Sequence, residues 1–260
     1  MACAWNVLAW RLCLTAVLAA CAFPGQAQTL VVGRAAVDST LADHAAAVMS
    51  EAARRSGLQL EFRRLPLVRS IELANEGAID ADLIRTREFG RAYSHLIALD
   101  TPIAHFDVAA YGASPDIAKR TRDDFRHLRI GAARGLALAQ AARDLPVVEV
   151  ATDGTLPEML RDGRFDVAIV SYVYGETWRN RFGGIYRWPV CWSSDPLVFH
   201  LNRKHAPLAS RLNAALEQMQ NEGLIARMYL DALRGSGVAP LECRVEGAAA
   251  NPARGTPHKR

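Results

Sequence analysis

Apolar positions in the first third of the chain form short runs and helical stripes. A run over residues 29–33 ends at a glycine and predicts a buried strand, and an alanine-rich stretch over 41–56 has apolar residues at helical spacing. Gly57 ends that helix, and residues 58–62 alternate into a second strand. Strand, helix and strand in this order predict a right-handed crossover between two parallel strands.

The pattern then continues through a second α/β unit and returns to the first. A helix over 70–76 ends at Gly77 and precedes a strand over 79–84, and a strand over 106–111 leads out of the first unit. Later strands are expected over 128–131, 147–150, 165–170 and 196–201, and later helices over 115–125, 136–143, 155–161, 207–222 and 224–233.

Two such units predict a two-lobed α/β fold in which each lobe is a mainly parallel sheet flanked by helices. We expect the first lobe over residues 28–111 and 195–246 and the second over 112–194. Residues 247–260 lack apolar periodicity and predict a disordered tail. Small ligands commonly bind between two lobes, so a ligand cleft is expected there.

Residues 1–27 predict an export signal. Their apolar run follows a single arginine and is shorter than the roughly 20 apolar residues that a membrane-spanning helix needs. Cleavage after Ala27 would release a soluble periplasmic protein. The four residues that end at Cys21 also resemble a lipobox, and processing there would leave the protein lipid-anchored at Cys21.

Composition is that of an exported globular protein. The chain is 50% hydrophobic with a formal net charge of +4, and no basic run is interleaved with aromatic residues as nucleic-acid binding would require. No later apolar stretch could span a membrane, and scattered histidines such as His200 and His205 are expected at the surface, with no metal site.

Cleavage after Ala27 leaves Cys191 and Cys243, which predict a disulfide; two buried free thiols are the alternative.

Three arginines follow the predicted strand over 79–84. Arg85, Arg87 and Arg91 lie beyond its carboxyl end, where small ligands bind in open α/β sheets. A guanidinium holds a carboxylate or phosphate through two parallel hydrogen bonds, so these residues are candidates for an anion site. The alternative is a solvated, charged surface.

Several motifs occur in an order that resembles one protein family. They are LP-x-x-R-S at 65–70, G-x-I-D at 77–80, Y-x-x-L-I-x-L-x-x-P-I at 93–103, LRIGAARG at 128–135 and MLRDGRFDVAIVS at 159–171. They resemble the family 3 periplasmic solute-binding proteins of ABC transporters, in a divergent branch of the amino-acid-binding type. The resemblance implies the type II periplasmic-binding-protein fold, a monomer, and no cofactor.

The resemblance also implies a function without catalysis. A receptor of this family captures a small polar solute, here anionic or amino-acid-like, and delivers it to an inner-membrane ABC permease. Capture would occur by hinge closure about the two crossings near Gly112 and Ser194, with both lobes contacting the ligand.

Ligand-binding positions of the family fall partly on the three arginines. Two hydroxyl-bearing positions correspond to Arg85 and Arg87, and the family's ligand arginine corresponds to Ala92, next to Arg91. Arginines at these places favour an anionic group over a neutral amino acid.

Other family positions also differ in this chain. Leu67 replaces the aromatic residue that stacks on the ligand, and the Gly-Thr pair that opens a helix toward the ligand carboxylate reads as Gly135 and a leucine. The backbone N–H groups of that helix could still hold an anion. Ser171 replaces the acidic residue that takes the ligand's ammonium, which weakens the prediction of an amino-acid ligand.

Arg69 is the arginine of the LP-x-x-R-S motif. It precedes the helix over 70–76 and could reach the cleft from there. It could equally form a structural ion pair with Glu72 or Asp80.

Two other functions fit the sequence. A periplasmic dehydratase-like enzyme on the same scaffold would need an acid or base in the cleft, and Glu88, Asp100 and Glu176 are available without an identifiable partner. The sequence contains no nucleophile-elbow, metalloprotease or nucleotide-loop motif. The other hypothesis is a ligand-binding sensor or accessory protein that docks on a membrane partner. The sequence alone does not separate it from a transport receptor.

Overall fold

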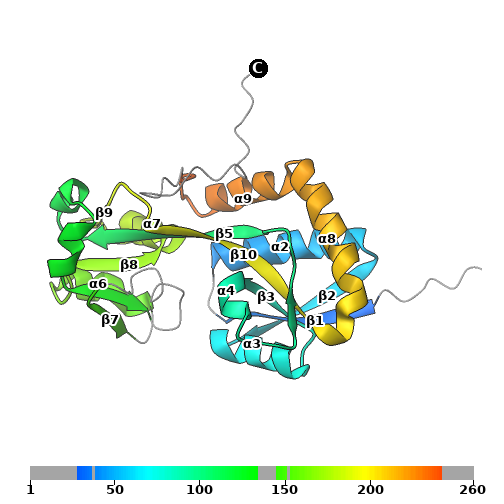
Figure 1. Cartoon of the computed structure of the whole chain (residues 1–260). Helices are drawn as coiled ribbons and strands as arrows, with labels where there is room; N and C mark the ends of the chain where they lie inside the picture. Colours follow the sequence, from blue (N-terminus) through cyan, green and yellow to red (C-terminus); the bar gives the residue numbers. More distant parts are fainter. Residues whose placement is uncertain (1–27, 37–38, 134–144, 151–152, 242–260) are drawn as a thin grey trace, which may run out of the picture.

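The computed structural model describes residues 28–36, 39–133, 145–150 and 153–241. Its strands form one sheet in the order β2-β1-β3-β10-β5-β8-β6-β7, with β4 paired to β10 and β9 paired to β5. Figure 1 shows two α/β units joined by the long strands β5 and β10. We call the part built on β1–β4 the first unit and the part built on β6–β8 the second unit.

The first unit begins as the hydrophobic pattern predicts. Helix α2 lies between two strands that pair in parallel, so the predicted parallel pairing is confirmed. Ser39 caps α2 by accepting a hydrogen bond from the Ala42 N–H, which satisfies one of the free donors at a helix start. The elements are β1 (Gln28–Ala35), α2 (Thr40–Arg55) and β2 (Leu58–Leu65).

The chain then runs through α3 (Leu67–Glu76), β3 (Ala81–Thr86), α4 (Arg87–Gly90) and β4 (Leu96–Ala98). Gly77 ends α3 with φ +79°, a left-handed conformation that glycine adopts without steric cost. The strand starts and ends two residues later than the predicted 79–84, and Asp80 lies just before its start. Its carboxylate accepts a hydrogen bond from the Val31 N–H at 2.8 Å.

The second unit contains parallel strands in the order β8-β6-β7. The predicted helix over 115–125 is wrong: the chain forms two short 3-10 helices separated by an extended Arg120. Asp124 accepts hydrogen bonds from the Thr121 N–H and hydroxyl, a local turn that competes with a continuous helix. The elements are β5 (Ala104–Gly112), η1 (Pro115–Lys119), η2 (Asp123–His127), β6 (Ile130–Ala133), β7 (Val147–Val150), η3 (Asp153–Thr155), α6 (Leu156–Arg161), β8 (Val167–Ser171), α7 (Tyr172–Phe182) and β9 (Tyr186–Arg187).

Helix α7 has no counterpart among the predicted elements, whereas the predicted helix over 136–143 lies outside the described residues. The predicted lipobox, leader and tail also lie outside them. The chain returns through β10 (Ser193–Asn202), η4 (Arg203–His205), α8 (Ala206–Asn221) and α9 (Leu224–Gly235). No helix within these described ranges combines the length and apolar character needed to cross a bilayer.

Strands β5 and β10 carry the chain between the units. Strand β5 pairs with β10 from Ala104 to Val108 and with β8 from Val108 onward, so it changes partner at Val108, four residues before Gly112. Strand β10 passes from β5 to β3 at Leu197. The Ser194 hydroxyl donates to the Asp107 carboxylate at 2.6 Å and ties the two strands together beside this point.

Candidate functional site

Arg85 lies at the end of β3 but points into the first unit. Its side chain is only 10% exposed. Its guanidinium donates to the Leu67 carbonyl at 2.5 Å and to the Ile84 carbonyl at 2.6 Å, and one nitrogen lies 3.3 Å from the Asp82 carboxylate. Arg85 therefore braces the start of α3 against the end of β3, and most of its donors are directed at the protein itself.

Asp82 is the buried partner of Arg85. Burial raises the pKa of this carboxyl to about 6, although the Arg85 charge and the Ser70 hydroxyl both act to lower it. The Ser70 hydroxyl donates to the carboxylate at 2.5 Å. A Cβ at Gly33 would lie 2.2 Å from the Ser70 oxygen, so a glycine is needed there for α3 to approach β1 this closely.

His200 corrects one expectation from the sequence. It is 1% exposed instead of lying at the surface. Its Nδ1 lies 3.2 Å from the Val198 carbonyl, and its Nε2 has no hydrogen-bond partner among the described residues. Burial and then the Arg85 charge lower the pKa of His200 to about 4, so the ring is neutral at pH 7. A Cβ at Gly90 would lie 2.0 Å from Nε2, so this ring sits directly against the backbone of α4.

Arg87 and Arg91 are more accessible than Arg85. Arg87 is 38% exposed, donates to the Asp100 carbonyl at 2.5 Å and lies 4.0 Å from the Asp100 carboxylate. Arg91 extends into solvent and pairs with Glu88 at 2.8 Å. The sequence predicts three cations in one loop, whereas the structure places Arg85 in β3, Arg87 in α4 and Arg91 just after α4. Each of the three has a carboxylate neighbour.

The LP-x-x-R-S element holds Leu67 and Arg69 at the start of α3. Leu67 is half-buried and its carbonyl is the acceptor for Arg85. The structural ion pair considered for Arg69 is present, because its guanidinium lies 3.5 Å from both Glu72 and Glu76. Asp80 instead pairs with Lys204 and His205.

On the second unit, Ser171 ends β8 and precedes α7. Its backbone pairs with Val108, and its side chain makes no capping hydrogen bond. Ser171 therefore lies beside the point where β5 changes partner. Gly135, the other candidate from this unit, lies outside the described residues, as does Cys243. Cys191 is buried, and its pairing with Cys243 stays a prediction.

Arg34 is a residue that the sequence analysis did not single out. It belongs to the carboxyl end of β1 and pairs with Asp43 in the first turn of α2 at 2.6 Å. Its side chain is mostly buried, and its Nε has no hydrogen-bond partner in the described part of the chain. Its position directly after the predicted strand over 29–33 was the available signal.

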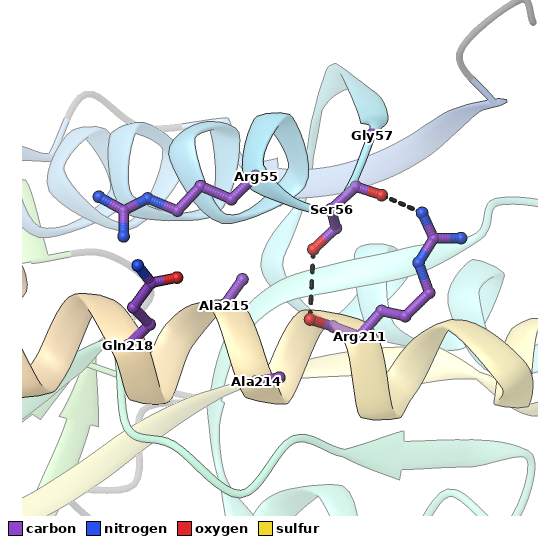
Figure 2. Close-up of a pocket in the computed structure, with 7 residues that line it drawn as sticks. All are labelled: Arg55, Ser56, Gly57, Arg211, Ala214, Ala215 and Gln218. Atoms are coloured by element: carbon purple, nitrogen blue, oxygen red, sulfur yellow. Dashed lines mark hydrogen bonds between the residues drawn. The ribbon is translucent and has the colours of Figure 1, made fainter.

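A separate cavity of about 450 Å³ lies between the end of α2 and α8. Figure 2 shows Arg55 and Arg211 at its two ends, with Ala214 and Ala215 of α8 between them. Arg211 donates to the Ser56 carbonyl, and Arg55 is paired with carboxylates of α2 and of the residue after α8. None of the predicted ligand residues lines this cavity. Among the described residues, no group of three or more histidines, cysteines and carboxylates could hold a metal ion.

No protein-family model matches the sequence, and no curated protein matches it. Solved structures do match. YtmK of Bacillus subtilis, a probable amino-acid ABC transporter extracellular-binding protein, aligns with a TM-score of 0.68 and 14% identity over 80% of this chain and 98% of that one. The chain has the type II periplasmic-binding-protein fold.

Two further structures show the range of proteins with this fold. AbpA of Streptococcus pneumoniae, an amino acid ABC transporter substrate-binding protein bound to L-arginine, aligns with a TM-score of 0.63 and 16% identity over 80% of this chain and 95% of that one. A histidine kinase sensor domain with similarity to periplasmic binding proteins aligns with a TM-score of 0.66 and 18% identity over 80% and 97%. Identities this low establish the shared fold alone.

Proposed function

We propose that the protein is a non-enzymatic solute-binding receptor that closes on a small polar, amino-acid-like or anionic solute and delivers it to an ABC permease. The observation that carries the proposal is the pair of α/β units joined through β5 and β10 in the type II fold. In such a fold a ligand that contacts both units stabilises their closed arrangement. We take the lobes as residues 28–111 with 195–246, and 112–194, in a mature periplasmic protein that starts at Gln28 or is anchored at Cys21.

Arg87 is the best candidate for the ligand's acidic group. Arg85 is occupied by Asp82 and two carbonyls, and Arg91 extends into solvent beside Glu88. Arg87 is partly exposed, and its guanidinium lies 4.0 Å from the Asp100 carboxylate, which is too far for a hydrogen bond between them. It therefore keeps N–H donors for a ligand. Its chemistry suits a single carboxylate or phosphate group.

A thermal-shift screen of the chain from Gln28 tests the receptor. L-arginine, L-glutamine, dicarboxylates, phosphorylated compounds and polyamines serve as probes. A bound solute at one hundred times its dissociation constant should stabilise the fold by about 2.7 kcal/mol and raise the melting temperature by several degrees. Arg87→Gln should remove most of an anion's shift.

The matched control is Arg54→Gln. Like Arg87, Arg54 is an exposed arginine beside a carboxylate, here Glu51, but it lies at the far end of α2. The control should leave the ligand shift unchanged. If no probe raises the melting temperature, or if both variants lose the shift equally, the receptor or its site is wrong.

A sensor without transport is the second candidate, because one matching structure is a histidine kinase sensor domain. A transport receptor should restore solute uptake to cells that lack it, whereas a sensor should change a signalling output and leave uptake intact. We also propose the Cys191–Cys243 disulfide. Non-reducing mass spectrometry should find the intact protein two mass units lighter than its reduced form.

A further inference from the structure

Helix α9 contributes to the cores of both units. Leu224, Ile225 and Met228, near its start, pack against the core of the first unit. Leu233, near its end, is fully buried in a core of the second unit that contains Tyr111. One helix therefore connects two hydrophobic cores that the sheet strands also link.

The chain after α9 continues this connection as a short strap over residues 236–241. Gly237, with φ +68°, turns the chain, and Val238 is buried in the core of the second unit. On the first unit, the Thr40 hydroxyl donates to the Ser236 hydroxyl oxygen at 3.1 Å. The strap is therefore held at its start by the amino-terminal end of α2.

Two side chains of α7 hold the strap on the second unit. The Tyr172 hydroxyl donates to the Ala239 carbonyl at 2.9 Å, and the Asn180 amide donates to the Gly237 carbonyl at 3.1 Å. These bonds use backbone carbonyls of the strap, so they depend on its path and not on its side chains. They lie on the unit that must rotate relative to α2 if the two units close.

The strap and the candidate ligand site lie on different sides of the crossing strands. Figure 1 shows α9 on one side of β5 and β10, and α3, α4 and β7 on the other. Rotation that brings α3 and β7 together about β5 and β10 opens the opposite side. Closure would therefore strain the path from α2 through the strap to α7, which runs through the Thr40–Ser236 bond and the two bonds to α7.

We propose that the strap restrains the hinge: its bonds to α7 stabilise the open arrangement, and weakening them raises the population of closed molecules even without ligand. The proposal rests on the closure motion of the proposed function. The strap is a third connection between the units, in addition to β5 and β10, and it lies outside the ligand site. It contributes to the free-energy difference between the open and closed states.

The test measures the distance between the units in the ligand-free protein. Spin labels are attached through p-azidophenylalanine at Val68 and Val148, which are 45% and 55% exposed on α3 and β7. The double variant Tyr172→Phe with Asn180→Ala removes both bonds to the strap and keeps the buried ring of Tyr172. The matched control is Tyr186→Phe with Asn221→Ala, a tyrosine and an asparagine for which the described structure has no hydrogen bond to the side chain.

Loss of two hydrogen bonds should raise the population at the shorter distance roughly tenfold, and each single variant should give part of that change. The control should keep the wild-type distribution. Identical distributions in wild type and double variant, with both folded by circular dichroism, would overturn the proposal. The distance measurement uses no solute, so its outcome is independent of the thermal-shift screen. A shifted distance together with no binding solute in that screen would reject the receptor and support the strap. Solute binding without a shifted distance would support the receptor and reject the strap.

Discussion

At the scale of single residues, Asp82 and His200 have opposite effects on stability over the same pH range. The pKa of Asp82 rises from 3.8 to about 6 on folding, so between these values the folded state holds a proton that the unfolded state has lost. Stability contributed by Asp82 therefore falls as pH rises. The pKa of His200 falls from 6.5 to about 4, so its contribution rises with pH across the same window.

The two effects nearly cancel in the wild type, and single variants should separate them. We expect the stability of Asp82→Asn, relative to wild type, to increase from pH 4 to pH 6, because only the His200 effect remains. His200→Gln should show the opposite trend relative to wild type. Urea unfolding at pH 4, 5, 6 and 7 measures both, and curves that run parallel to wild type would contradict the assignment.

The sequence could place Arg85 near the end of β3 but not orient it. Arg85 lies within β3, one residue before its end and not beyond it as predicted. Whether its guanidinium turns toward ligand or protein depends on Asp82, three residues earlier, and on the carbonyl of Leu67. Alternation in a strand shows which residues share a face, but a long side chain at a strand end can reach either way. His200 was misplaced for a related reason, since a histidine within a strand can be buried neutral beside a glycine.

At the scale of elements, Gly175 allows α7 to pack against β5. A Cβ at this position would lie 2.2 Å from the ring of the fully buried Tyr111. We expect Gly175→Ala to destabilise the protein by about 1–3 kcal/mol, because the overpacked contact outweighs the gain in helix propensity. Urea unfolding at pH 7 measures the change.

Gly235→Ala is the control for this prediction. Gly235 ends α9 with a negative φ, and a Cβ there meets nothing within 4 Å. It should be neutral or stabilise the fold by up to about 1 kcal/mol, since alanine restricts the unfolded chain. Equal effects of the two substitutions would show that Tyr111 yields readily to an added methyl group.

The elements that sequence patterns predicted well have regular apolar spacing and clear ends. The 41–56 and 207–222 helices differ from α2 and α8 by single residues at their ends. Helix α7 was missed because its buried residues include Gly175 and Tyr172, which do not form a simple apolar stripe with Val173 and Trp178. The 3-10 helices in place of a helix over 115–125 accompany a local turn in which Asp124 accepts two hydrogen bonds from Thr121. Apolar periodicity does not predict such a turn.

At the scale of the whole molecule, repeated strand-helix order was enough to predict two α/β units, and the motif order was enough to predict their family fold. Neither signal indicated that β5 and β10 join the strands into one sheet, because that continuity depends on pairing between residues far apart in sequence. Neither indicated that α9 enters both cores. These long-range contacts predict that the units unfold together.

Tryptophan fluorescence tests this coupling because the tryptophans of the chain from Gln28 all belong to the second unit. Trp178, Trp188 and Trp192 are each buried in hydrophobic clusters of this unit, and the cluster of Trp188 and Trp192 also contains Leu41 of α2. Far-UV circular dichroism, in contrast, is dominated by the long helices α2, α8 and α9. We expect the two probes to give the same urea midpoint, because β5, β10 and α9 link both units and a two-state transition makes different probes coincide. A fluorescence midpoint clearly below the circular dichroism midpoint would mean that the second unit unfolds alone and that the crossing strands couple the units only weakly.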